Sequence, residues 1–235
     1  MTKIILKNVT LDYPVLGVDD LSFKKSFMTK TVGGIINNDL KKRVFVRAID
    51  NISLNINEGE KIGIYGSNGS GKSSLLRLIA GIFEPTFGEV IVEGSINSLL
   101  SISFGLEDHL SGIENIKFRL KLKNLASNAE NKLLNEIVDF LNLGNFLYLP
   151  VKIYSTGMRL RLAFALAILV QANIILMDEW LSVGDENFNK LAQIKIQKLI
   201  KDSSIFIICS QNKQILETIC DKIIILDKGK IFYER

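Results

Sequence analysis

A glycine-rich segment near residue 70 has the residue types and the spacing needed to hold phosphate groups. Gly66 is followed by four residues and then by Gly71-Lys72-Ser73, which is the pattern of a phosphate-binding loop. Glycines let the backbone curl so that successive N–H groups point at one anion, Lys72 adds a full positive charge, and the Ser73 hydroxyl is placed to ligate Mg²⁺. The residues predicted to contact a nucleotide here are Gly66, Ser67, Asn68, Gly69, Ser70, Gly71, Lys72, Ser73 and Ser74.

Two carboxylates follow a short apolar run about 100 residues further along the chain. Ile174 to Met177 reads as a buried strand, and Asp178 and Glu179 come directly after it. An apolar strand that ends in an acidic turn is common, but its position after a phosphate-binding loop makes it a specific signal. We expect Asp178 to hold Mg²⁺ together with Ser73. Glu179 would polarise the attacking water, with Lys72 assisting hydrolysis.

The elements around these residues alternate between strands and helices. Such alternation predicts an α/β fold with a mostly parallel core sheet. The glycine segment lies between an expected strand and an expected helix, which is the context that its pattern requires. Strands are expected at 4–11, 49–56, 61–65, 89–92, 96–101, 173–177, 204–209 and 222–226, with Tyr13-Pro14 ending the first; helices are expected at 74–80, 113–123, 128–143, 154–170, 186–200 and 213–220.

Composition narrows the classes of protein that fit. The chain has 235 residues, 47% hydrophobic and 23% charged, with a net charge of +4. This charge suits an acidic ligand or an anionic membrane surface but is too weak to predict nucleic-acid binding. Cys209 and Cys220 are expected to be reduced cytosolic thiols. The apolar region from 160 to 177 is better explained by a helix and a strand than by a membrane span, so a cytoplasmic protein without a leader peptide is predicted.

Residues 15–47 fit poorly with the elements on either side. Large apolar residues and lysines mix in the run from Leu21 to Met28, and Lys41-Lys42-Arg43 closes the segment. A basic segment that carries aromatic residues can lie in a lipid headgroup interface. A solvated surface insertion explains the same composition equally well, so the residues alone leave both interpretations open.

Three further motifs resemble those of one known family. The run Tyr154-Ser155-Thr156-Gly157-Met158 resembles the signature segment of ATP-binding cassette (ABC) proteins, in the version found in the branch that exports O-antigen, capsule and teichoic acid. The segment from Glu179 to Asp185 is similar to that branch's Asp-Glu-x-Leu-x-Val-Gly-Asp run. Residues 109–115 resemble its Leu-Thr-Gly-x-Glu-Asn segment. The resemblance extends over essentially the whole chain.

The resemblance implies a single ABC ATPase domain over residues 1–235. It implies a P-loop NTPase fold with a RecA-like core sheet, an antiparallel β subdomain and a helical subdomain inserted at about 103–165. Each chain would bind ATP and Mg²⁺, and two chains would pair head to tail as a homodimer. Ser155 and Gly157 of one chain would then face the γ-phosphate held by the other, and Asp185 would occupy the position of the family's D-loop aspartate.

The same resemblance implies a place and a partner. ATP hydrolysis would drive an integral membrane permease subunit that exports a lipid-linked polysaccharide. The chain would lie peripherally at the cytoplasmic face of the inner membrane. Residues 15–47 would occupy the position of an amphipathic membrane-interface helix, which favours the membrane interpretation of that segment.

The sequence departs from the family pattern in two places. Gln211 stands where the family has its switch histidine, and no glutamine occurs from 95 to 115, where the Q-loop glutamine is expected. The first departure supports an alternative function, a slow ATP-dependent dimerisation switch or scaffold. For adenine stacking, Tyr13 matches the upstream aromatic of the family best and Phe45 is the alternative, although core packing explains either ring as well.

Overall fold

The structure is a computed structural model that describes residues 1–15, 35–38, 44–100, 105–122, 127–168, 171–179 and 186–233. Contacts between residues divide the chain into two compact units. The first consists of Met1–Leu100, Ala172–Trp180 and Ser203–Arg235, and the second of Ser101–Gln171 and Leu181–Asp202. Each unit has a hydrophobic core of its own.

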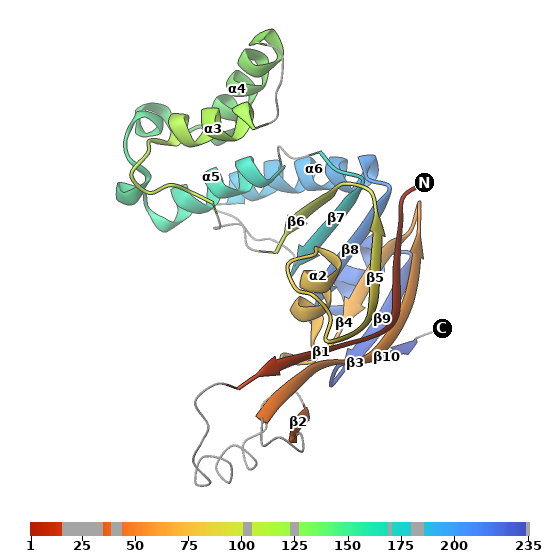
Figure 1. Cartoon of the computed structure of the whole chain (residues 1–235). Helices are drawn as coiled ribbons and strands as arrows, with labels where there is room; N and C mark the ends of the chain where they lie inside the picture. The colour runs from red at the N-terminus through yellow and green to blue at the C-terminus, as the bar shows by residue number, and fades with distance from the viewer. Residues whose placement is uncertain are drawn as a thin grey trace. The chain divides into compact units, whose positions relative to one another are not determined.

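A six-stranded sheet forms the centre of the first unit (Figure 1). Neighbouring strands run parallel except for the pair at one edge, β10 and β9, which is an antiparallel hairpin. The predicted α/β fold with a mostly parallel core sheet is therefore confirmed. In spatial order the strands are β10 (Lys230–Tyr233), β9 (Lys222–Asp227), β4 (Lys61–Tyr65), β8 (Ile205–Ser210), β7 (Ile174–Asp178) and β6 (Ile96–Leu99).

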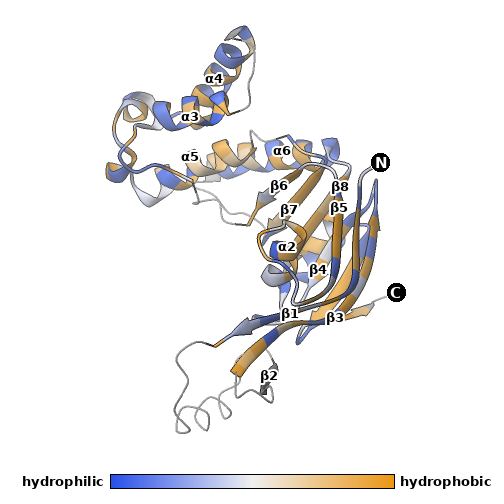
Figure 2. Cartoon of the chain, in the orientation of Figure 1, coloured by the Kyte–Doolittle hydropathy of each residue, from blue (hydrophilic) through white to orange (hydrophobic). Residues whose placement is uncertain are grey.

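The central strands are apolar on both faces. Every residue of β8 is buried, and so are the first four residues of β7. Continuous burial is typical of parallel strands covered on both sides, and these strands are mainly hydrophobic in Figure 2. Helix α2 (Lys72–Ile79) contacts β7, while α7 (Lys213–Ile219) contacts β4, β8 and β9.

The second sheet of this unit has four antiparallel strands. In spatial order they are β2 (Ile35–Asn38), β3 (Val44–Asn57), β1 (Lys3–Pro14) and β5 (Phe87–Glu93). β1 ends at Pro14, but it extends three residues past the expected end at Leu11 and includes Tyr13 and Pro14, which pair with Val46 and Phe45 of β3. Proline lacks an N–H, but β5 pairs with β1 only as far as Thr10, so Pro14 has a strand neighbour on one side and is tolerated as on an edge strand.

The segment 15–47 is described only in part. Strand β2 lies inside it, and β3 begins at Val44, five residues before the expected strand start at Ile49. Residues 16–34 and 39–43 lie outside the described residues, so the membrane interpretation of this segment stays a prediction.

The second unit consists of helices. They are α3 (Gly112–Lys121), α4 (Ser127–Leu141), the short 3-10 turns η1 (Gly144–Tyr148) and η2 (Val151–Ile153), α5 (Thr156–Ile168) and α6 (Glu186–Asp202). Its core includes the aliphatic residues Ile116, Leu141 and Leu162. Phe164 and Phe188 join α5 and α6 by an edge-on contact, with ring centroids 6.0 Å apart. The unit includes α6 as well as the predicted helical range 103–165, and the division of the chain into functional domains stays a prediction. Among the described residues, no helix is long and apolar enough to cross a bilayer.

The segment 109–115 has a structural role within the second unit. Ser111 caps α3 through a capping box with Glu114: the Ser111 hydroxyl accepts from the Glu114 N–H, and the Glu114 carboxylate accepts from the Ser111 N–H at 2.8 Å. The Ser111 hydroxyl also donates to the Glu114 carboxylate at 2.6 Å, and this bond, followed by the one from the Ser111 N–H, lowers the pKa of Glu114. Asn115 is buried, and its amide donates to the carbonyls of Glu107 and Ser111. Capping and loop closure therefore account for this motif.

Candidate functional site

The glycine segment forms a tight loop between β4 and α2. Gly69 and Gly71 have φ angles of 77° and 107°, in the left-handed region that favours glycine. A Cβ added at Gly71 would lie 2.5 Å from the Ala48 carbonyl oxygen, and one at Gly66 would lie 2.4 Å from that of Leu226. Only glycine fits these two positions, because the loop is pressed against neighbouring backbone.

Lys72 begins α2 and places its charge at the loop. Its ammonium group donates to the carbonyl oxygens of Gly66 and Ser67, at 2.8 and 2.9 Å, and the residue is buried. Both partners are neutral, so the loop retains a net positive charge. Together with the N–H groups at the start of α2, this charge forms an anion-binding end of the helix.

Asp178 ends β7 beside the same helix. Its carboxylate accepts a hydrogen bond of 2.5 Å from the Ser73 hydroxyl, which joins two residues 105 positions apart in the chain. One hydroxyl and one carboxylate oxygen are hard ligands of the kind that Mg²⁺ takes from a protein, with phosphate oxygens and water completing its coordination. The predicted metal pair, Ser73 and Asp178, is thus adjacent, and its donors fit the ion.

Glu179 follows in a strained backbone conformation. Its φ angle is 69°, which is uncommon for a residue other than glycine or asparagine. Two consecutive residues of β8 hold it: its N–H donates to the Cys209 carbonyl at 2.9 Å, and its carboxylate accepts from the Ser210 hydroxyl at 3.1 Å.

Gln211 lies on the other side of the loop, directly after β8. Its side-chain amide donates to the Asn68 side-chain oxygen at 2.8 Å. The residue in the switch-histidine position therefore contacts the phosphate-binding loop itself. Because an amide carries no charge, this contact is an ordinary neutral hydrogen bond.

Tyr13 and Phe45 differ in their surroundings. The Tyr13 hydroxyl donates to the Ser74 hydroxyl at 3.1 Å, and its ring meets Phe83 edge-on at 5.6 Å. Phe45 lies beside Arg47, whose guanidinium carbon is 5.6 Å from the ring centroid. A hollow of about 430 Å³ is lined by Tyr13 but not by Phe45; its lining residues are Tyr13, Val46, Ala48, Asn68, Gly69, Gly71, Lys72, Ser73, Ser74, Asp178, Glu179 and Gln211.

The comparisons with known proteins match this geometry. The family model for "ABC transporter" matches residues 49–182, which is more than half of the chain. The chain belongs to the ABC transporter family. Members of this family bind and hydrolyse ATP with Mg²⁺, so this chain is an ATP-binding subunit with ATPase chemistry. That chemistry needs a positively charged phosphate loop, a pair of residues that can hold Mg²⁺ and a carboxylate that can act as a base, and Lys72, the Ser73–Asp178 pair and Glu179 fit these needs.

Two curated relatives show the level of similarity. The O-antigen export system ATP-binding protein RfbE of Yersinia enterocolitica is 39% identical over 235 residues, which cover 100% of this chain and 98% of the relative. The teichoic acids export ATP-binding protein TagH of Listeria innocua is 34% identical over 229 residues, which cover 97% of this chain and 65% of the relative.

A solved structure supports the fold. The dimeric structure of the ATP-binding cassette MJ0796 in a post-hydrolysis state, bound to ADP and Pi, matches with a TM-score of 0.71 at 23% identity. The match covers 99% of this chain and 97% of that one. The predicted ABC-type fold is therefore confirmed.

The signature segment of this ABC protein begins α5 in the second unit. Ser155 is exposed, directly before the helix, and its hydroxyl accepts from the Met158 N–H at 3.3 Å. The first turn of α5, which includes Gly157, contains no acidic residue. A long helix whose exposed start carries no acidic residue can receive an anion. Asp185 lies outside the described residues.

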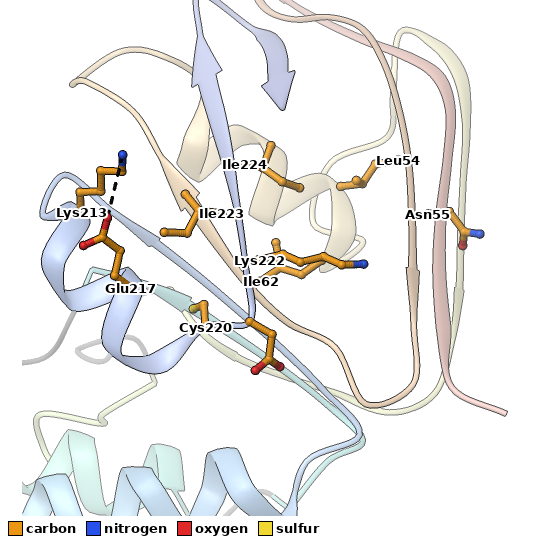
Figure 3. Close-up of a pocket in the computed structure, with 10 residues that line it drawn as sticks. Leu54, Asn55, Ile62, Lys213, Glu217, Cys220, Lys222, Ile223 and Ile224 are labelled. Atoms are coloured by element: carbon orange, nitrogen blue, oxygen red, sulfur yellow. Dashed lines mark ion pairs between the residues drawn. The ribbon is translucent and has the colours of Figure 1, made fainter. Parts of the chain in front are cut away.

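A second hollow of the first unit is larger, at about 690 Å³. Figure 3 shows it between α7, the start of β9 and strand β3, at the opposite ends of the parallel strands from the phosphate loop. Lys213 and Glu217 pair across one turn of α7 at 3.9 Å, and Cys220 lines the wall. Burial and the nearby Asp221 raise the pKa of the Cys220 thiol to about 12. Its volume alone would favour this hollow as the nucleotide site. Its lining residues include no glycine loop and no converging hydrogen-bond donors for phosphate, so we place the chemistry in the smaller hollow.

The sequence reasoning missed Ser210. This serine is 1% exposed and contacts the carboxylate that the reasoning had selected. Its position directly before Gln211, at the end of a fully apolar strand, is the one signal that could have found it.

Proposed function

We propose that this chain is the ATPase subunit that powers export of a lipid-linked polysaccharide, of O-antigen or capsule type, through a separate membrane permease. The observation that carries the ATPase part is the convergence of Lys72, the Ser73–Asp178 pair and Glu179 around one hollow. The names of the relatives, O-antigen and teichoic acids export proteins, support the cargo class.

Each residue has a distinct task in this proposal. The backbone of the phosphate loop and Lys72 bind the phosphates and orient the γ-phosphoryl group. Ser73 and Asp178 hold Mg²⁺, which neutralises charge on the phosphate oxygens when it is bound. Glu179 accepts a proton from the attacking water. Gln211 donates a neutral hydrogen bond toward the γ-phosphate, and Tyr13 stacks on the adenine ring.

We infer that the working unit is a homodimer. The smaller hollow of the first unit is lined by the residues proposed to bind phosphate, hold Mg²⁺ and act as the general base. The exposed start of α5 belongs to the second unit. Ser155 and Gly157 of a second copy would add N–H donors at the γ-phosphate and exclude water from it. Asp185 is proposed to act at the same junction.

The test of the function is a transport assay with the cognate permease. The full chain is coexpressed with that membrane protein, and the complex is assayed for export of lipid-linked polysaccharide and for ATP hydrolysis. We expect export that depends on ATP and is lost in Lys72→Met. Glu217→Gln, a change in the larger hollow, is the matched control and should leave export intact. A chain that copurifies with no permease, or a complex that hydrolyses ATP but moves no glycan, would contradict the proposal.

We further propose that the chain works at the cytoplasmic face of the inner membrane as a peripheral protein. The basic composition of residues 15–47 supports this location. Binding of the full chain to anionic vesicles should weaken as salt rises, because such attraction is screened within roughly 8–10 Å at physiological ionic strength. If a chain that lacks residues 21–30 keeps both vesicle binding and permease assembly, the segment is a surface insertion.

A further inference from the structure

Ser210 is a buried hydroxyl at the reacting end of the core sheet. It is the last residue of β8, which pairs in parallel with β7 so that Cys209 lies opposite Asp178. Only 1% of its surface is exposed, so neither solvent nor substrate reaches it freely. Any effect of Ser210 on the reaction must therefore pass through the groups that it contacts.

The direction of its hydrogen bonds follows from simple counting. A serine hydroxyl has one hydrogen to donate and two lone pairs to accept with. The Asn212 N–H donates to the Ser210 oxygen at 3.1 Å, which uses a lone pair. The hydrogen is thus directed to the Glu179 carboxylate, 3.1 Å away, which as an ion can only accept.

Glu179 depends on this contact for its orientation. Its backbone is held by the bond to Cys209, but three side-chain torsions separate the backbone from the carboxylate. Within the part of the chain that the structure describes, the hydroxyl of Ser210 is the side-chain donor that reaches the carboxylate. Loss of this donor would leave the backbone in place and free the carboxylate to rotate.

We propose that Ser210 is a positioning residue for ATP hydrolysis. Its hydroxyl fixes the Glu179 carboxylate in the orientation from which it accepts the proton of the attacking water. The inference rests on the proposed role of Glu179 as the base. Ser210 itself touches neither nucleotide nor metal in this assignment.

The first experiment measures kcat and KM for MgATP on the full-length Ser210→Ala and Ser210→Thr variants. We expect Ser210→Ala to lower kcat by about 10- to 100-fold, the scale of a small misplacement of a reacting group. Its KM should stay within about twofold, because the residues proposed to contact the phosphates and the adenine ring are unchanged. Ser210→Thr keeps the donor and should recover most of kcat. A KM that rises with kcat unchanged would overturn the proposal.

A double-mutant cycle keeps the proposal falsifiable if the threonine methyl does not fit. In the Glu179→Gln background there is no carboxylate base to orient, so adding Ser210→Ala should change the residual turnover by less than about twofold. A merely structural role would lower turnover by the same factor in both backgrounds, and that result would refute positioning. Melting curves of all four proteins are recorded to verify that each is folded.

The cycle also separates this inference from the function on which it rests. If Glu179→Gln alone keeps near-parental turnover, the base assignment fails, and the positioning role fails with it. If Glu179→Gln loses turnover but Ser210→Ala matches the parent, Glu179 keeps its role and only the assignment to Ser210 is wrong.

Discussion

Two of the hollows formed by described residues of the first unit lie at opposite ends of its parallel strands, and the chemistry is proposed for the smaller one. The hollow at the carboxyl ends of β4 and β7 has a volume of about 430 Å³, while the one at the amino ends of β4 and β9 has about 690 Å³ (Figure 3). Loops and helix N-termini follow the carboxyl ends of parallel strands, so binding groups converge there. Volume is a poor guide to function when the two ends of a sheet differ in this way.

The charges in the two hollows are also arranged differently. In the larger hollow Lys213 pairs with Glu217, and Lys222 pairs with Glu60, so each cation is compensated. In the smaller hollow the described hydrogen bonds of Lys72 go to the neutral carbonyls of Gly66 and Ser67, so within the described residues no ion pair neutralises its charge. Uncompensated charge therefore distinguishes the two better than the number of charged residues does.

The largest expected difference comes from making the same change in each hollow. Glu179→Gln should lower turnover by ~10²–10⁴-fold, the usual contribution of a positioned general base, while ATP still binds and traps a dimer visible by light scattering. Glu217→Gln should leave turnover unchanged and lose only a helix-surface pair worth ~0.3–0.5 kcal/mol. Steady-state ATPase assays compare the turnover of the two variants. Equal losses of turnover would contradict the assignment of the chemistry to the smaller hollow.

ATP affinity should distinguish Tyr13, which lines the smaller hollow, from Phe45, which does not. Tyr13→Ala should remove a stacking contact worth ~1–3 kcal/mol, which weakens ATP binding by roughly 5- to 150-fold. Tyr13→Phe keeps the ring and loses only the bond to Ser74, so most affinity should remain. Phe45→Ala is the control outside the hollow. Titration with a fluorescent ATP analogue measures all three, and a larger loss in Phe45→Ala would transfer the stacking role to that residue.

Gln211 should have a smaller effect, and on turnover only. Gln211→His should raise turnover by up to about tenfold, corresponding to ~1.4 kcal/mol of transition-state stabilisation, because a charged donor strengthens as the transferring group gains charge. Gln211→Ala should fall below the parent with ATP affinity nearly intact. The parent should show little inflection near pH 6.5, where a histidine titrates. If Gln211→Ala hydrolyses ATP at the parental rate, its side chain does not reach the phosphate.

A substitution in the larger hollow should have the smallest effect on ATPase activity. Cys220→Ser should leave ATPase activity unchanged. Because the pKa of Cys220 is raised to about 12 from 9.0, its thiol stays protonated and should react slowly with iodoacetamide at pH 8 in the native protein, but quickly after unfolding. A raised pKa also means that stability should be lost as the pH rises from about 9 toward 12, since the unfolded thiol ionises first. Burial raises the pKa of Cys209 in the same direction. Rapid native labelling of the half-buried Cys220 thiol would contradict its raised pKa.

The sequence predicted the parts of the site that consist of special residue types. Gly66, Gly71 and Lys72 stand out because few other patterns need those residues at that spacing, and Asp178-Glu179 stands out because two acids end an apolar run. Ser210 could not be predicted in this way. A serine at the end of a strand is ordinary, and its contact with Glu179 exists only because β8 lies between β4 and β7 in the sheet.

The strand boundaries predicted for the antiparallel sheet differ from the structure for a related reason. Tyr13-Pro14 carries a local signal for a break, and β1 ends there, but the strand includes both residues because β3 extends back to Val44 and offers Phe45 and Val46 as partners. Pairing between segments about 30 residues apart therefore extended β1 up to the proline, which the local pattern did not predict. The sequence motif at 109–115 was recognised, but its capping role required the hydrogen bonds of the structure.

The backbone of Glu179 has a consequence for how this position can vary. Among the described residues, five other than glycine have positive φ, and three of them are asparagines: Asn8, Asn51 and Asn142. Asparagine is the residue that tolerates this conformation best after glycine, so these three positions carry a residue suited to their backbone. At position 179 the chain instead keeps a glutamate at a conformational cost of roughly 1–2 kcal/mol. Selection for folding and selection for turnover therefore oppose each other at this residue, and a screen for stability alone would discard it.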